Sequence, residues 1–152
     1  MPESIQVRPA SIEDSQTIVD YQLAMAMETE SLELHRPTVA LGVAAVFDDS
    51  NKGTYMIAQC DDRIVGSLLT IPEWSDWRNG TVLWIHSVYI EPEMRRRGVF
   101  CKMYGHLKQK VERSNDLRGL RLYVDRKNHP AQSAYQSLGM TKEHYEMYEW
   151  MP

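Results

Sequence analysis

The segment 81–124 constrains the fold most, because its hydrophobic period changes twice within it. The stretch "TVLWIHSVYI" alternates as a strand does, and the next apolar residues recur at helical spacing, at Val99, Met103, Leu107 and Val111. The stretch "GLRLYV" then reads as a second strand. A strand–helix–strand unit of this kind pairs its strands in parallel with a right-handed crossover. Ligands favour the crevice that opens where such a unit meets a switch in strand order.

The rest of the chain alternates between strand and helix patterns. Ser11 and Asp14 have capping-box spacing and predict the start of a helix. The further segments are a strand at 4–10, helices at 11–28 and 38–47, strands at 54–60 and 63–71, a helix at 129–139 and a final strand at 144–151. This order predicts an α/β chain with a mixed sheet, helices on both of its faces, and a single domain over 1–152.

Composition excludes several classes of protein. The chain has 152 residues, of which 43% are hydrophobic and 25% charged, as in an ordinary globular domain. It has no apolar run of membrane-spanning length and no signal-peptide pattern at its start, which predicts a cytoplasmic location and no membrane partner. Cys60 and Cys101 lack metal-like spacing, so we expect two buried thiols and no metal.

Charge is distributed unevenly. The first 50 residues carry nine acidic side chains against two basic ones, although the net charge of the chain is only -4. This asymmetry suits a protein that holds a cation on one side and an anion on the other. A solvated helix face explains any single acid equally well. The acidic total and the lack of an extended basic stripe argue against a nucleic-acid partner.

The stretch "EPEMRRRGVF" places three arginines directly before the start of the 99–113 helix. Each cation at the positive end of a helix dipole costs about 0.3 to 1 kcal/mol unless an anion lies beside it. Helix N-termini bind phosphate through unpaired amides, and Gly98 lets the backbone come close to such a ligand. The stretch therefore predicts a phosphate or pyrophosphate site. A nuclear-import patch and a solvated surface run are the competing interpretations.

Two segments carry a resemblance to a known family. The pattern Arg95-x-x-Gly98-x-Phe100 after a strand resembles the acetyl-CoA signature R/Q-x-x-G-x-G/A of the GNAT superfamily of N-acetyltransferases. Asn128, Ala131, Tyr135 and "LGM" resemble the second hallmark segment of that family. Both occur in the right order, and the order of strands and helices matches over nearly the whole chain.

The resemblance implies acetyl-CoA as a co-substrate and a role for each matched position. The pantetheine arm would bond to backbone groups of Val88 and Ile90. The pyrophosphate would be held by the loop and helix start, namely Arg95, Arg96, Arg97, Gly98, Val99 and Phe100. The second segment would add cofactor contacts from Asn128, Ala131 and Tyr135. Phe100 departs from the family pattern, which has Gly or Ala there, so its side chain must point away from the phosphates.

Two side chains are candidates for proton transfer. Strand alternation places Trp84, His86, Val88 and Ile90 on one face. Imidazole has a pKa near neutrality, so His86 is the candidate general base, with a satisfied core histidine or a histidine on the wrong face as the alternatives. Tyr135 matches the family's general acid for the departing thiolate, and simple helix packing is its alternative. With no nucleophilic triad in the sequence, we expect direct attack by the amine in a ternary complex.

The acceptor is predicted to be a cationic primary amine, either a small molecule or a peptide. In folds of this kind the first helices and the loop before the cofactor strand form the acceptor wall. Glu28 and Glu33, with Trp74 and Trp77, would hold an ammonium through charge and cation–π contacts. The tryptophans and the final aromatic strand suit a homodimer contact equally well. An acyl-CoA-binding sensor without turnover is the alternative to an enzyme.

Overall fold

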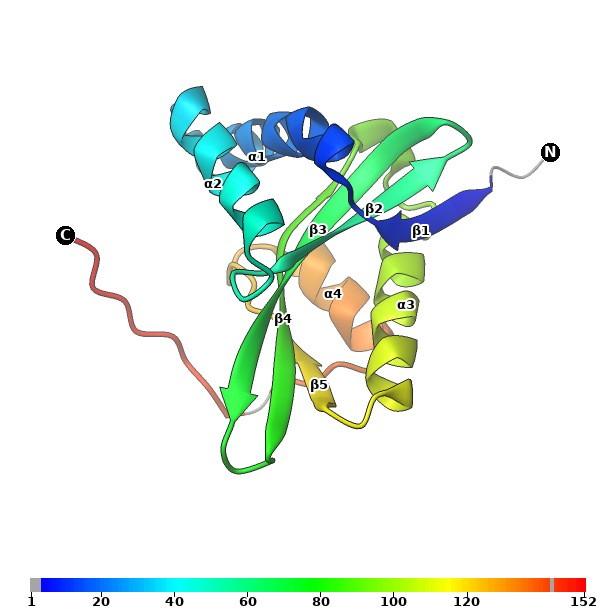
Figure 1. Cartoon of the computed structure of the whole chain (residues 1–152), viewed down its shortest axis with the longest axis vertical. Coiled ribbons are helices and arrows are strands. Elements are labelled where there is room, and N and C mark those ends of the chain that lie inside the picture. Colours follow the sequence, from blue (N-terminus) through cyan, green and yellow to red (C-terminus); the bar gives the residue numbers. More distant parts are fainter. Residues whose placement is uncertain (1–3, 143) are drawn as a thin grey trace. The chain divides into compact units, whose positions relative to one another are not determined.

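The sheet forms the centre of the first of two compact units. The computed structural model describes residues 4–142 and 144–152, with one unit ending at Leu122 and the other beginning at Tyr123. The five-stranded sheet has the order β1-β2-β3-β4-β5 (Figure 1). Its strands are β1 (Ile5–Pro9), β2 (Thr54–Cys60), β3 (Arg63–Ser75), β4 (Gly80–Ile90) and β5 (Leu117–Arg121). Neighbours are antiparallel up to β4, and β4 pairs with β5 in parallel, which confirms the mixed sheet.

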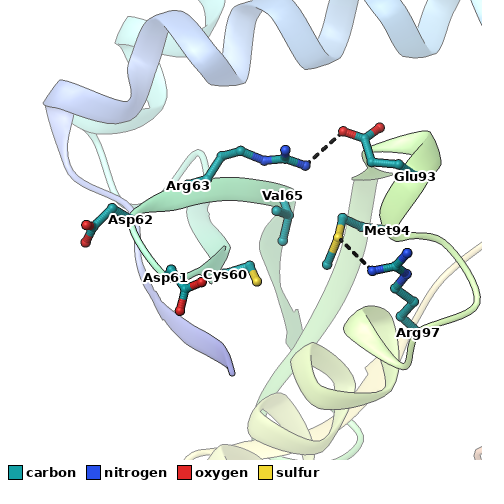
Figure 2. Close-up of a pocket in the computed structure, with 8 residues that line it drawn as sticks. All are labelled: Cys60, Asp61, Asp62, Arg63, Val65, Glu93, Met94 and Arg97. Atoms are coloured by element: carbon teal, nitrogen blue, oxygen red, sulfur yellow. Dashed lines mark hydrogen bonds and ion pairs between the residues drawn. The ribbon is translucent and has the colours of Figure 1, made fainter. Parts of the chain in front are cut away.

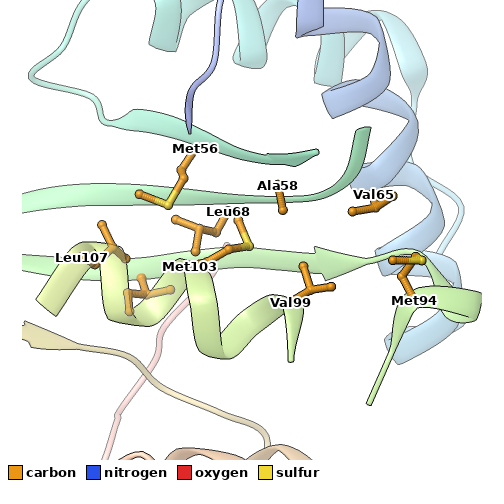
Figure 3. Close-up of a cluster of buried hydrophobic side chains, with 9 residues drawn as sticks. Met56, Ala58, Val65, Leu68, Met94, Val99, Met103 and Leu107 are labelled. Atoms are coloured by element: carbon orange, nitrogen blue, oxygen red, sulfur yellow. The ribbon is translucent and has the colours of Figure 1, made fainter. Parts of the chain in front are cut away.

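Helices cover both faces of this sheet, as the element order predicts. They are α1 (Ser15–Glu30), α2 (Arg36–Asp48) and α3 (Val99–Arg113), with short 3-10 turns η1 (Ile12–Asp14) and η2 (Pro92–Met94). On one face the apolar stripe of α3 buries Met103 and Leu107 among strand residues such as Leu68 (Figure 3). Each of these fully buried side chains stabilises the fold by about 2 kcal/mol. On the opposite face, residues of α1 and α2 pack around Tyr55 and Ile57.

The entry into α1 is fixed by a buried carboxylate. Asp14 accepts from the backbone N–H of Ser11 at 2.8 Å, as a capping residue does. Its two oxygens also accept from the Nη1 and Nη2 atoms of Arg8, at 2.7 and 3.0 Å. The Arg8 guanidinium is the largest cause that holds the pKa of Asp14 below its usual value. Strand β1 and the start of α1 are therefore joined by a charged, bidentate contact.

The second unit contains α4 (His129–Ser137). The side chain of Asn128 caps this helix by accepting from the N–H of Ala131 at 3.2 Å. The predicted final strand is wrong, because residues 144–152 form no strand in the structure. The side chains of Tyr145, Tyr148 and Trp150 are exposed there. Alternation and aromatic content give only a propensity, whereas a strand also needs a neighbour for its backbone hydrogen bonds.

Two further sequence predictions can be compared with the fold. The tight turn between β2 and β3 is confirmed, since Cys60 pairs with Arg63 across it. Cys101 is exposed and Cys60 half-buried, so the prediction of two buried thiols is wrong. Within residues 4–142 and 144–152, no helix has both the length and the apolar character needed to cross a bilayer. The same residues contain no cluster of His, Cys, Asp or Glu suited to a metal ion.

Candidate active site

Strands β4 and β5 separate halfway along β4, and this separation defines the candidate site. Their parallel ladder runs from Thr81 opposite Leu117 to Trp84 opposite Arg121, where β5 ends. Strand β4 continues to Ile90, and on its other edge it stays paired with β3 as far as Gly66. Among the described strands, β4 beyond Trp84 therefore pairs only with β3. Its second edge presents backbone groups to an extended ligand.

A β-bulge at Ser87 lies within this stretch. The register moves from Leu69 opposite His86 to Ser67 opposite Tyr89, so β4 carries one extra residue. Ser87 has a φ of 52°, in the left-handed region that non-glycine residues rarely adopt. Bulges of this kind turn the following side chains to the other face.

The bulge overturns the predicted face of β4. Val88 and Ile90 pack against the cluster beneath α3, as Ile85 does. The ring of Tyr89 faces α1, with its centre 4.8 Å from that of Tyr21. The prediction that Val88 and Ile90 share a face with His86 is therefore wrong. Simple alternation fails because the extra residue shifts the period by one.

His86 lies on the face opposite α3. Its ring centre is 6.3 Å from that of Trp84, two residues earlier on the same strand. Burial lowers the pKa of this half-buried imidazole below its usual value. The ring is consequently neutral at neutral pH, which is the protonation state that a general base requires.

The loop after β4 forms a turn with two residues in the left-handed region. Arg96 has a φ of 64° and Gly98 a φ of 78°, and α3 begins at Val99. The first backbone bond of α3 runs from the N–H of Lys102 to the carbonyl of Gly98. The N–H groups of the preceding helical residues have no acceptor within the helix and can bind an anion. A Cβ atom at Gly98 would meet no atom within 4 Å, so the backbone here is open to a ligand.

The side chain of Phe100 has the orientation that its departure from the family pattern requires. Its ring packs against the hydrophobic cluster beneath α3, with its centre 6.3 Å from that of Tyr104. The side chain is therefore directed into the fold, and a bulky residue at this position is compatible with an anion at the helix start.

The three arginines of the loop have different surroundings. The guanidinium of Arg95 forms a bidentate pair with Glu28 at the end of α1. The Nη1 atom of Arg97 lies 3.9 Å from the sulfur of Met94, and the Arg96 side chain is exposed. The positive charge of Arg95 is thus already compensated, which sequence reasoning did not predict.

Arg97 also lines an open pocket of about 610 Å³ between the β2–β3 turn and η2 (Figure 2). At its rim the Nη2 atom of Arg63 is 2.8 Å from carboxylate oxygens of both Glu91 and Glu93. Arg63 therefore joins the β2–β3 turn to the segment that follows β4. The other lining residues are Cys60, Asp61, Asp62, Val65 and Met94.

Sequence reasoning also missed a charged group at the point where β4 and β5 separate. The Cζ atom of Arg121 lies 6.0 Å from the ring centre of Trp84. Its Nη1 atom is 3.2 Å from an Oε1 atom of Glu73 on β3. The separation of 48 positions between Arg121 and Glu73 hides the pair from any local pattern.

The four predicted acceptor residues do not form one group. Trp74 and Trp77 are exposed at the end of the β3–β4 hairpin. Glu28 lies in the last turn of α1, and Glu33 is exposed in the segment that follows it. Figure 1 shows the tip of this hairpin far from α1 and α2. The prediction that these four residues form one ammonium site is therefore wrong, because β3 and β4 continue well past the helices before they turn.

In the second unit, Tyr135 lies on α4 and is half-buried. Burial raises the pKa of its phenol. The hydroxyl therefore retains its proton at neutral pH, as a general acid must. Asn128 and Ala131 serve the start of the same helix through their capping bond.

Comparison with known proteins identifies the family. A model of the acetyltransferase (GNAT) family matches residues 21–140, and the chain belongs to this family. A possible acetyltransferase from Clostridium difficile 630 is 38% identical, with 99% of both chains covered and a TM-score of 0.90. No curated protein is a significant match.

Two distant structures share the fold. The ribosomal-protein-alanine N-acetyltransferase from Brucella melitensis biovar Abortus 2308 is 11% identical, with 98% of this chain and 100% of that chain covered and a TM-score of 0.80. An aminoglycoside N-acetyltransferase in complex with CoA is 12% identical, with 99% and 97% covered and a TM-score of 0.75. At these identities the likeness shows the fold alone.

Proposed function

We propose that the protein is an acetyl-CoA-dependent N-acetyltransferase that moves an acetyl group to a primary amine by direct attack in a ternary complex. The observation that carries this proposal is the course of β4 after Trp84. The strand leaves β5 and continues through η2 into the turn at Arg96–Gly98 and the start of α3. An extended backbone edge followed by an anion site matches a pantetheine arm that ends in a pyrophosphate.

The cofactor contacts follow from this match. Backbone groups of Val88 and Ile90 would bond to the amides of the pantetheine arm. The N–H groups of Gly98, Val99 and Phe100 would hold the pyrophosphate, with Arg96 and Arg97 supplying positive charge. Asn128 and Ala131 are assigned to the cofactor from the second family segment alone.

The chemistry needs one base and one acid. The amine nitrogen attacks the thioester carbonyl carbon, and the imidazole of His86 accepts the amine proton. The carbon–sulfur bond then breaks, and the Tyr135 phenol gives its proton to the departing sulfur. A lowered pKa supports the role of His86. For Tyr135 the support is its family motif, together with a half-buried phenol that is protonated at neutral pH.

The acceptor is a cationic primary amine in this proposal. The excess of acidic side chains in the first 50 residues supports it, since those residues include the α1–α2 region that forms the acceptor wall in folds of this kind. Similar folds include an aminoglycoside N-acetyltransferase and a ribosomal-protein-alanine N-acetyltransferase. Aminoglycosides, alanine-bearing peptides and polyamines are therefore the first amines to test.

The test is a turnover screen. Purified protein is mixed with acetyl-CoA and each amine, thiol release is followed, and CoA binding is measured by calorimetry. We expect thiol release with at least one cationic amine. CoA binding without thiol release across the panel would instead favour the acyl-CoA sensor.

A further inference from the structure

The side chain of Arg95, the first arginine of the cofactor signature, contacts three other residues of the protein. Its Nε atom donates to the carbonyl of Ile90 at 2.9 Å. Its Nη2 atom donates to Glu28 at 3.0 Å, and its Nη1 atom donates to the other carboxylate oxygen. Its Cζ atom lies 5.5 Å from the ring centre of Tyr89. These contacts join the end of β4, the following turn and the last turn of α1.

Helix α1 contacts the segment after β4 at a second residue, Glu91. Tyr21 lies seven positions before Glu28, which places both side chains on the same face of the helix. The Tyr21 hydroxyl is 3.0 Å from Glu91 Oε1 and equally close to the carbonyl oxygen of Ile64. Side chains on one face of α1 therefore contact the chain both before η2, at Glu91, and after it, at Arg95.

The bidentate pair changes what Arg95 can contribute to anion binding. A planar guanidinium whose outer nitrogens both donate to one carboxylate has its charge compensated and its orientation fixed. Exposed ion pairs usually have little effect on stability, but bidentate pairs within a wider network are the recognised exception. The pair therefore suits a role in shaping the turn better than a role in attracting phosphate.

We propose that Arg95 is a positioning residue for acyl-CoA: with Glu28 it fixes the turn from Arg95 to Gly98, so that the backbone N–H groups at the start of α3 face the pyrophosphate. Glu28 then belongs to the cofactor loop and not to the acceptor site. This inference rests on the proposed function, because it assumes that acyl-CoA binds at this turn.

The two roles for Arg95 predict opposite effects of Glu28→Gln. If Arg95 positions the turn, the loss of a bidentate acceptor weakens CoA binding by about tenfold, the effect expected of one charge-assisted hydrogen bond. If Arg95 instead binds phosphate through its charge, removal of a nearby carboxylate tightens CoA binding. Calorimetric titration with CoA measures the sign directly.

A matched control is Asp20→Asn. Asp20 also lies on α1 and also pairs with an exposed arginine, Arg36, which lies outside the cofactor loop. The substitution removes the same charge and the same type of ion pair. We expect CoA affinity to stay within about twofold of wild type. A loss equal to that of Glu28→Gln would attribute the effect to α1 charge in general and overturn the proposal.

Arg95→Lys tests the shape of the side chain separately from its charge. Lysine keeps the positive charge but cannot form the planar fork, so we expect it to lose CoA affinity about as far as Glu28→Gln does. Retention of wild-type affinity in Arg95→Lys would overturn the proposal. So would a fall in melting temperature in either variant with unchanged CoA affinity, because that pattern indicates a merely structural pair.

The outcomes for this inference and for the proposed function are distinct. A wild-type protein that does not bind CoA contradicts both. A wild-type protein that binds CoA, with tighter or unchanged binding in Glu28→Gln, contradicts the role of Arg95 alone.

Discussion

His86 and Trp84 lie on the same face of β4 with their ring centres 6.3 Å apart, immediately before the bulge at Ser87. The imidazole is half-buried there, and burial lowers its pKa. A lower pKa means that the ring loses its proton at a lower pH than an exposed histidine would. The pH dependence of turnover therefore tests its assigned role as the base.

We expect kcat/KM to rise with pH and to level off, with the rise centred below about pH 6.5, the usual pKa of histidine. His86→Gln should remove this rise and lower kcat by about 10²-fold or more while CoA affinity is retained. Steady-state rates between pH 5 and pH 9 provide the measurement. An unchanged profile in the variant would show that another group or a water molecule takes the proton.

Tyr135→Phe tests the acid. Loss of the hydroxyl should lower kcat by about 10² to 10⁴, the range for general acid–base groups, with CoA affinity close to wild type. Tyr148→Phe is the matched control, since Tyr148 is an exposed tyrosine of the same unit. Equal rates in the two variants would contradict the assigned role of Tyr135.

The sequence predicted much of the fold because its patterns are local. The change of hydrophobic period after Ile90 identified the parallel unit, and the spacing of Ser11 and Asp14 identified the start of the first helical turn. A final strand was predicted from propensity alone, and that prediction is wrong. Strand formation depends on a neighbouring backbone, which an alternating pattern does not reveal.

The site was predicted less completely because its key features are not local. A bulge at a serine has no clear sequence signal, whereas a glycine or asparagine at Ser87 would have suggested a positive φ. The pair of Arg95 and Glu28 joins positions 67 apart, so no local sequence pattern reveals it. The motif spacing identified the loop, whereas the surroundings of Arg95 and Arg97 depend on packing that the motif does not contain.

Replacement of glycine by alanine should change the free energy of unfolding in opposite directions at Gly98 and at Gly105. Gly98 has a φ of 78°, whereas Gly105 lies within α3, and a Cβ atom at either position would meet no atom within 4 Å. Gly98→Ala should destabilise the fold by about 1 kcal/mol because alanine is strained in the left-handed region. Gly105→Ala should stabilise it by about 0.5 to 1 kcal/mol through helix propensity. Urea unfolding measures both free energies, and equal signs would contradict the backbone explanation.

The buried carboxylate of Asp14 predicts a dependence of stability on pH. Hydrogen bonding from Arg8 is the largest cause of its lowered pKa in the folded protein. A lowered folded-state pKa means that the contribution is present above the unfolded pKa of about 3.9 and is lost as the pH falls through the folded value. Asp14→Asn should therefore reduce the free energy of unfolding at neutral pH by about 1.5 to 3 kcal/mol, the range for a charged hydrogen bond.

The same variant should differ less from wild type in acid. When Asp14 of the wild type is protonated, its ionic contact with Arg8 is lost, so the two unfolding free energies converge as the pH falls through the lowered folded-state pKa of Asp14. Denaturant titrations at neutral and acidic pH provide the comparison. A difference between wild type and Asp14→Asn that stays constant across this pH range would show that the Arg8–Asp14 contact acts through packing and not through charge.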